Sequence, residues 1–98
     1  MIDASLRIDK WLWFARFCKS RGLAAAWCSN GDVTLNGTAV TKPAQAVRPG
    51  DVVAIPAGPH RHRRVRVITL GNRRGPAPEA RTLYEDLGLT IEKRDAPW

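Results

Sequence analysis

Arginine and lysine residues are spaced through residues 7–51 in a way that suits phosphate binding. They stand at expected helix starts and turns, and the apolar residues between them are expected to form the core. The cationic positions are Arg7, Lys10, Arg16, Lys19, Arg21, Lys42 and Arg48. A small folded frame that holds guanidinium and ammonium groups outward can position a polyanion through its phosphates.

Catalytic chemistry has little support in the sequence. No Gly-rich phosphate loop follows a predicted strand, and no nucleophile stands beside a histidine and an acid in a known spacing. Asp9, Asp32 and Asp51 each have a capping or turn explanation. We therefore predict a protein without enzymatic activity and without a cofactor.

The cysteines and histidines do not follow the pattern of a metal site. Cys18 and Cys28 lie ten residues apart, and His60 and His62 belong to a separate segment. Two cysteines make a poor disulfide framework, and a structural zinc site normally needs four ligands. Free thiols and no bound metal are the expected state.

The charge balance favours an anionic partner. The chain has 98 residues, a single-domain length, with 16 Lys and Arg against 9 Asp and Glu. Residues 59–81 form a second basic block of seven arginines and one acid. Such a balance points to nucleic acid or an anionic membrane surface. Because no apolar run reaches the roughly 20 residues of a membrane span and no cleavage pattern follows the N-terminus, we expect a cytoplasmic protein without membrane contact.

Two helices are predicted in the first third of the chain. Asp9 is a suitable N-cap for a helix over residues 10–17, which is apolar around most of its circumference. Ser20 can cap a second helix over residues 21–29, and Asn30-Gly31 supplies its stop. The short connection between the helices would make a compact corner.

The middle of the chain predicts a small antiparallel sheet. Asn36-Gly37 is a two-residue hairpin turn within residues 33–40, a register that places Leu35 opposite Thr38. A turn over residues 48–51 leads to a strand over residues 52–55. These segments would form the first strands of the sheet.

The second basic block predicts one more strand, over residues 63–70. Val65 and Val67 alternate there with Arg64 and Arg66, so one side of the strand packs and the other carries a positive ridge.

A last helix is predicted over residues 78–87, with Pro78 at its start and Gly88 as its stop. The fold class is therefore α+β, with a helix pair packed on a small, twisted antiparallel sheet and a C-terminal helix.

Four cations converge on the predicted starts of the two helices. Arg7 and Lys10 flank the first start, and Lys19 and Arg21 flank the second. Backbone N–H groups and the helix dipole would also favour an anion there, so phosphate contact is the favoured interpretation. The alternative is that Arg7 or Arg21 simply pairs with Asp9.

Further candidate contact residues lie elsewhere in the chain. They are Arg16, Ser20, Asn36, Lys42, Arg64, Arg66, Arg73 and Arg74. An extended segment before a proline would hold Lys42 outward, whereas Asn36 is first of all a turn residue. The ridge of Arg64 and Arg66 could instead protect a strand edge, and Arg16 could instead pack its stem on aromatic rings.

One set of residues resembles the S-four RNA-binding domain, named for the fourth protein of the small ribosomal subunit. The matching residues are Arg7-Ile8-Asp9, Leu12, Ser20-Arg21, Ala25, Gly31, Val33, Asn36-Gly37, Lys42-Pro43, Val47 and Gly50-Asp51. The resemblance covers about residues 7–55. It implies RNA as the partner and the α+β fold of that domain.

A closer resemblance is to the bacterial fifteen-kilodalton heat-shock protein family of ribosome-associated factors. It rests on Asp9-Lys10-Trp11-Leu12-Trp13, Ala15-Arg16-Phe17, Lys19-Ser20-Arg21, Arg73-Arg74, Glu79-Ala80 and Leu83-Tyr84-Glu85. This resemblance implies binding to the free large ribosomal subunit that still carries a nascent chain on tRNA, and help in recycling that particle. The known members continue into a basic tail that these 98 residues do not contain.

The combined expectation is a monomeric protein that recognises the shape of structured ribosomal RNA without chemistry. Residues 1–58 would form the S-four core, residues 59–90 would pack on the same domain, and residues 91–98 would be a frayed tail. Two alternatives stay open: an accessory subunit that acts with a separate RNA-modifying enzyme, and a DNA-binding regulator.

Overall fold

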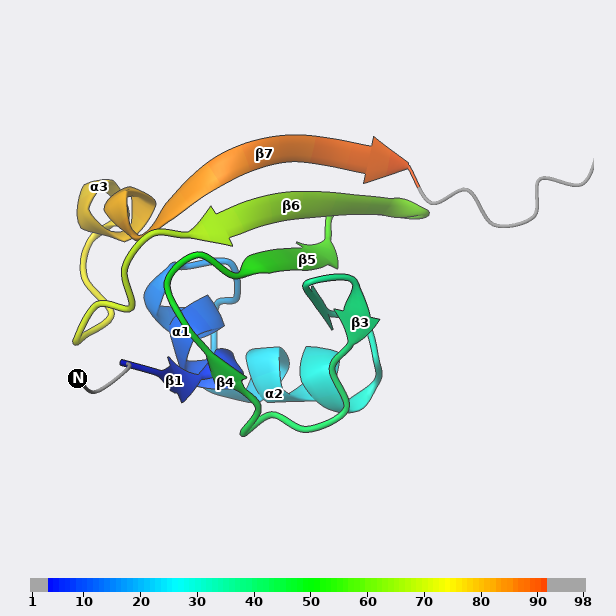
Figure 1. The fold of residues 1–98 in the computed structure, drawn as a ribbon, viewed down its shortest axis with the longest axis horizontal. Helices are drawn as coiled ribbons and strands as arrows, with labels where there is room; N and C mark the ends of the chain where they lie inside the picture. Colours follow the sequence, from blue (N-terminus) through cyan, green and yellow to red (C-terminus); the bar gives the residue numbers. More distant parts are fainter. Residues whose placement is uncertain (1–3, 92–98) are drawn as a thin grey trace, which may run out of the picture.

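The computed structural model describes residues 4–91 and shows an α+β domain, which confirms the predicted fold class (Figure 1). The elements in chain order are β1 (Leu6–Arg7), α1 (Ile8–Phe14), α2 (Arg21–Ser29), β2 (Thr34–Leu35), β3 (Thr38–Ala39), β4 (Ala46–Val47), β5 (Val52–Pro56), β6 (Arg61–Val67), α3 (Ala77–Ala80), the 3-10 helix η1 (Arg81–Leu83) and β7 (Tyr84–Ile91). In Figure 1 the helices α1 and α2 lie together on one side of β5, β6 and β7.

The second helix matches its prediction at both ends. α2 spans Arg21–Ser29, and the Ser20 hydroxyl accepts a hydrogen bond from the Leu23 backbone N–H at 3.1 Å. Gly31 follows with φ +77°, a left-handed conformation that glycine adopts at low cost. Local capping chemistry is therefore enough to define this helix.

The first helix begins earlier and ends earlier than predicted. Arg7 stands at the N-cap position of α1, so the prediction that Asp9 caps this helix was wrong. The carbonyls of Pro43 and Gln45 accept hydrogen bonds from the N–H groups of the first two helical residues, at 3.3 and 2.8 Å. Because a distant backbone segment caps the helix, the Asp9 carboxylate is left to bind other partners.

The sheet is antiparallel throughout, with the strand order β3-β2-β5-β6-β7. The predicted hairpin is confirmed, with φ +51° at Asn36 and +87° at Gly37. Leu35 pairs with Thr38, which is the expected register. Positive φ at both turn residues matches the twist that a two-residue hairpin requires.

β6 separates two faces of the sheet. It starts two residues before the predicted strand and ends at Val67. Val65 and Val67 are buried, whereas Arg64 and Arg66 are exposed, as the alternation predicts. We call the side of the buried valines the inner face and the side of the two arginines the outer face.

The C-terminal part differs most from its prediction. Helical structure ends at Leu83, and the residues expected to complete a helix form β7, which pairs with β6 along its length. Gly88 has φ +103° and lies beside a register shift in this pairing instead of ending a helix. Pairing with β6 gives the backbone of these residues partners in the sheet, so tertiary structure overrides the local pattern. The predicted tail lies outside the described residues, apart from Ile91.

The core lies between the helix pair and the inner face. Its largest fully buried side chains include Ile8, Trp11, Leu12, Val33, Val47, Val53, Val65 and Val67. Trp11 also donates its indole N–H to the Thr69 carbonyl at 3.1 Å. A two-stranded sheet that the sequence did not predict, β1 with β4, pairs Arg7 with Ala46 beside this core.

Candidate nucleic-acid interface

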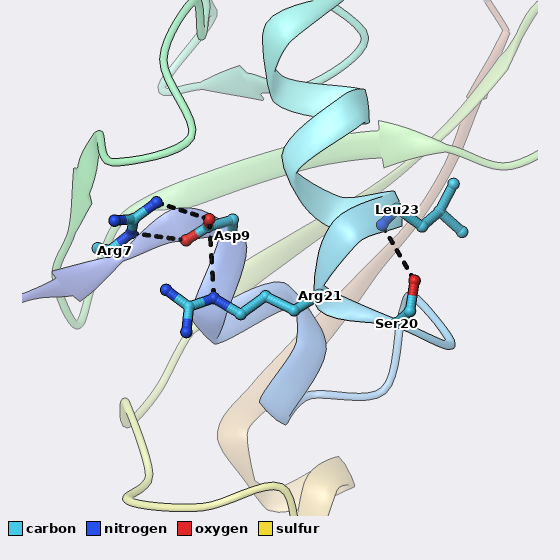
Figure 2. A network of polar contacts seen from close by, with 5 residues as sticks. All are labelled: Arg7, Asp9, Ser20, Arg21 and Leu23. Atoms are coloured by element: carbon cyan, nitrogen blue, oxygen red, sulfur yellow. Dashed lines mark hydrogen bonds and ion pairs between the residues drawn. The ribbon is translucent and has the colours of Figure 1, made fainter.

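A buried carboxylate joins two arginines at the start of α1 (Figure 2). Arg7 donates from Nε and Nη2 to the two oxygens of Asp9, at 3.0 and 2.9 Å. Arg21 Nε lies 3.8 Å from Asp9 Oδ2. The Asp9 side chain is 3% exposed, whereas those of Arg7 and Arg21 are 48% and 44% exposed. The two guanidinium groups are thus held by one internal acid and still face solvent.

This trio carries a net positive charge. Two guanidinium groups share one carboxylate, so one positive charge is left unbalanced. The hydrogen bond with Asp9 raises the pKa of Arg7 above its usual value, because the carboxylate stabilises the charged guanidinium. Pairing with Asp9, the alternative weighed above, is therefore present, but it leaves both arginines partly available to a polyanion.

Lys42 comes to the same end of the helix pair through the backbone. The segment that follows it caps α1, since the Pro43 carbonyl accepts from the Asp9 N–H, and the Lys42 carbonyl accepts from the Gln45 N–H at 3.0 Å. The lysine itself is exposed. Residues far apart in the sequence are thus brought to one place.

Two more cations belong to the helix pair. Lys10 is half-buried, with its ammonium 5.6 Å from the centre of the Phe14 ring. Lys19 is exposed directly before Ser20, whose hydroxyl is used as the α2 cap. We call Arg7, Lys10, Lys19, Arg21 and Lys42 the helix-pair surface, and it stays a prediction that all five face the same partner. Five cations and the one acid Asp9 make this surface strongly positive.

The start of α1 does not offer free amides to an anion, contrary to the expectation for both helix starts. Its first two N–H groups already donate to the backbone of residues 43–45. At the start of α1, side-chain charge and not free backbone amides is therefore what the surface presents, and anion contact at the start of α2 stays a prediction.

Two of the predicted contact residues hold the loop before α3 against α1. Arg16, at φ +66°, donates to the Gly75 carbonyl at 2.6 Å. Arg74 donates to the Trp13 carbonyl at 3.1 Å and stacks 5.4 Å from the centre of the Trp13 ring. These contacts give both arginines a structural role, and contact with a nucleic acid stays a prediction for them.

Three arginines of the second basic block form ion pairs with acidic residues. Arg73 forms two hydrogen bonds with Glu79, at 3.0 and 2.6 Å, which lowers the pKa of the Glu79 carboxyl. Arg66 lies 3.4 Å from Glu85, and Arg63 pairs with Asp86. The two acids on β7 were expected on a helix, so these pairings could not be foreseen.

Asn36 is occupied at its turn. Its amide group donates to Asp51 at 3.1 Å and its carbonyl accepts from the Val52 N–H at 2.9 Å. Arg64 is exposed on the outer face and forms no ion pair within residues 4–91. These two predicted residues lie on the sheet, apart from the helix-pair surface.

Both cysteines are buried. Burial raises the pKa of the Cys18 thiol to about 12 and that of Cys28 to about 11.

Within the described part of the chain, no group of three or more His, Cys, Asp or Glu residues is arranged to hold a metal ion. None of the described helices has the length and apolar character to cross a membrane.

A family comparison defines the class of the protein. The S4 domain family model matches residues 6–53, the part that forms the helix pair and the first strands of the sheet. The chain thus contains an S4 domain, which confirms the resemblance to this domain found in its sequence.

Similar proteins define the family more narrowly, and the chain belongs to the heat shock protein 15 family. It is 40% identical over 89 residues to the heat shock protein 15 homolog of Aeromonas salmonicida, covering 91% of this chain and 66% of that protein. The Haemophilus influenzae homolog is 34% identical over 95 residues, covering 97% of this chain and 71% of that protein. The chain thus spans about two thirds of the length of these relatives.

A solved structure supports the same family. The heat shock protein 15 of Vibrio cholerae has a TM-score of 0.78 and 36% identity, with 85% of this chain and 82% of that chain covered. That structure is described as trimeric. The sequence led us to expect that this chain is a monomer, and this stays a prediction.

Proposed function

We propose that this protein binds structured ribosomal RNA through the helix-pair surface and does no chemistry on it. The observation that carries the proposal is the Asp9 trio, in which one buried carboxylate holds the partly exposed Arg7 and Arg21 beside the exposed Lys42. Fixed cations on a rigid frame suit backbone phosphates of defined spacing, and they favour recognition by shape. Ser20 contributes by holding the start of α2.

The particle that we propose as the partner is the free large ribosomal subunit with a stalled nascent chain on tRNA. Binding there would aid recycling of the subunit, and it implies a cytoplasmic protein. Membership of the heat shock protein 15 family supports this proposal. Residues 1–58 would supply the RNA-binding core, and residues 59–90 would brace it by extending the same sheet.

Sedimentation tests the proposal. A tagged chain of residues 1–98 is mixed with purified large and small bacterial ribosomal subunits and centrifuged through a sucrose gradient at low salt. We expect the protein to travel with the large subunit, and Arg21→Ala to shift it toward the top of the gradient. Arg81→Ala removes the same charge from an exposed site on η1 and serves as the matched control.

Two results would contradict the proposal. One is protein that stays at the top of the gradient with both subunits. The other comes from a competition experiment in which the protein is bound to labelled ribosomal RNA at fixed salt. If unlabelled duplex DNA displaces the labelled RNA as well as unlabelled ribosomal RNA does, the result would favour a DNA-binding regulator. Co-purification with a catalytic RNA-modifying partner would favour the accessory-subunit alternative.

A further inference from the structure

A hollow on the outer face of the sheet is not used by the helix-pair surface. It has a volume of about 620 Å³, and its lining includes Thr34, Asn36, Ala54, His62, Arg64 and Thr90. This volume falls in the range of roughly 300–1,000 Å³ that small-molecule sites occupy. The residues come from four neighbouring strands and from the hairpin turn, so the backbone of the sheet fixes their positions.

Register explains why the hollow exists. Arg64 pairs across the sheet with Ala54 on one side and with Gly88 on the other, and His62 pairs with Thr90. Small residues on both sides of Arg64 leave space above the sheet. The positive φ of Gly88, +103°, makes a larger residue strained at that position.

Charge distinguishes Arg64 from its neighbours. Arg66, two residues further along the same face, lies 3.4 Å from Glu85, and Arg63 pairs with Asp86. Opposite Arg64, β7 presents a glycine instead of an acid. Among the described residues, Arg64 therefore has no acidic partner, in a hollow that also holds an imidazole and two threonine hydroxyls.

We propose that this hollow binds one unpaired RNA nucleotide, with the phosphate on Arg64 and the base over the Ala54 floor. Arg64 and His62 supply donors for phosphate oxygens, and the hydroxyls of Thr34 and Thr90 can donate to or accept from a base edge. The proposal rests on the proposed function, because it takes RNA as the ligand.

The hollow and the helix-pair surface lie on opposite sides of the sheet. Side chains of β5 and β6 that face the core pack with α1, whereas those of the hollow point to the opposite side of the sheet. One nucleotide cannot contact both surfaces. The protein would therefore hold a structured segment on its helix-pair surface and an unpaired nucleotide on its outer face.

Titration of the ¹⁵N-labelled full chain followed by NMR tests the proposal. The probes are UMP, uridine, inorganic phosphate and a single-stranded uridine hexamer. We expect UMP and the hexamer to shift the amides of Ala54, His62, Arg64 and Thr90. Uridine lacks the phosphate and inorganic phosphate lacks the base, so both should bind more weakly.

Two variants assign the effect to Arg64. Arg64→Gln should weaken UMP binding about tenfold, as expected for one charge-assisted contact. Arg66→Gln is the matched control, because it removes an arginine of the same strand and face that is already paired with Glu85. It should change the affinity less than Arg64→Gln does. Amide spectra of both variants without ligand check that the fold is kept.

Several outcomes would overturn the proposal: no shifts in the hollow, equal affinity for inorganic phosphate and UMP, or equal losses in the two variants. Ribosomal RNA binding is measured in parallel on the same samples. If the chain binds ribosomal RNA while the hollow does not respond to UMP, only this inference fails. If it binds no ribosomal RNA at all, the proposed function itself fails.

Discussion

Both carboxylate oxygens of Asp9 accept hydrogen bonds from the guanidinium of Arg7, at 3.0 and 2.9 Å, although the two residues are only two positions apart. The turn from β1 into α1 allows this geometry, because Arg7 is still extended while Asp9 is already helical. A planar guanidinium and a carboxylate that meet through two parallel bonds fix each other's orientation. The orientation of Arg7 is thereby set within the protein itself.

Replacing Asp9 by asparagine separates positioning from simple charge. Asp9→Asn makes the surface more positive, which alone would strengthen RNA binding. We expect weaker binding instead, because the amide cannot accept both bonds from Arg7 and cannot attract Arg21. Loss of the charged hydrogen bonds should also lower the free energy of unfolding by about 1–3 kcal/mol. Urea unfolding and fluorescence anisotropy with labelled ribosomal RNA measure the two effects, and tighter binding would refute the positioning role.

Replacing Arg21 by alanine should weaken RNA binding and leave thermal stability nearly unchanged. Its side chain is 44% exposed, and its contact with Asp9, at 3.8 Å, is longer than the bonds of Arg7. Thermal melting monitored by circular dichroism measures the stability of Arg21→Ala, and the anisotropy assay measures its RNA affinity. A large drop in melting temperature with intact binding would assign Arg21 to structure alone.

Salt should weaken binding steeply. If about five phosphates are neutralised by the helix-pair surface, log affinity falls against log salt with a slope of roughly −3 to −5. The slope is measured for the wild-type chain and for Lys42→Ala, which should make it shallower by about one unit. A slope near zero would contradict an electrostatic footprint.

Arg74 should behave as a structural residue. Arg74→Ala removes a hydrogen bond to the Trp13 carbonyl and a stacked contact on the Trp13 ring, so the free energy of unfolding should fall by about 1–3 kcal/mol. Arg73→Ala is the control, since water screens its exposed pair with Glu79 and its loss should change stability little. The opposite outcome would be that Arg74→Ala leaves stability unchanged and lowers RNA affinity more than Arg73→Ala does. That result would indicate that Arg74 contacts RNA.

Alkaline pH should destabilise the fold through its thiols. Desolvation raises the pKa of Cys18 to about 12 and that of Cys28 to about 11, both above the ordinary value of 9.0. The folded state thus holds these protons more tightly than the unfolded chain, and stability should fall as the pH rises from about 9 toward 11. Urea unfolding between pH 8 and 10.5 measures the decline, which should be smaller when both cysteines are alanine. An identical decline in that variant would exclude the thiols as its cause.

Local signals were sufficient for part of the fold and of the site. The second helix and the hairpin at Asn36-Gly37 follow from capping and turn chemistry within a few residues, so their boundaries or register could be predicted. The cations at the helix starts were also apparent, together with the possibility that Asp9 pairs with Arg7 or Arg21. The expectation of RNA as the partner came from the residues that resemble the S-four domain.

The sequence by itself determined the α+β class, the second helix, the hairpin and the strong positive charge, because these depend on neighbouring residues and on composition. Only the tertiary structure decided which arginines stay available. Arg74 is tied to Trp13, 61 positions away, and the acids of β7 reach Arg63 and Arg66 because residues 84–91 form a strand and not a helix. Such pairings depend on contacts between distant segments, whose energies no local pattern contains.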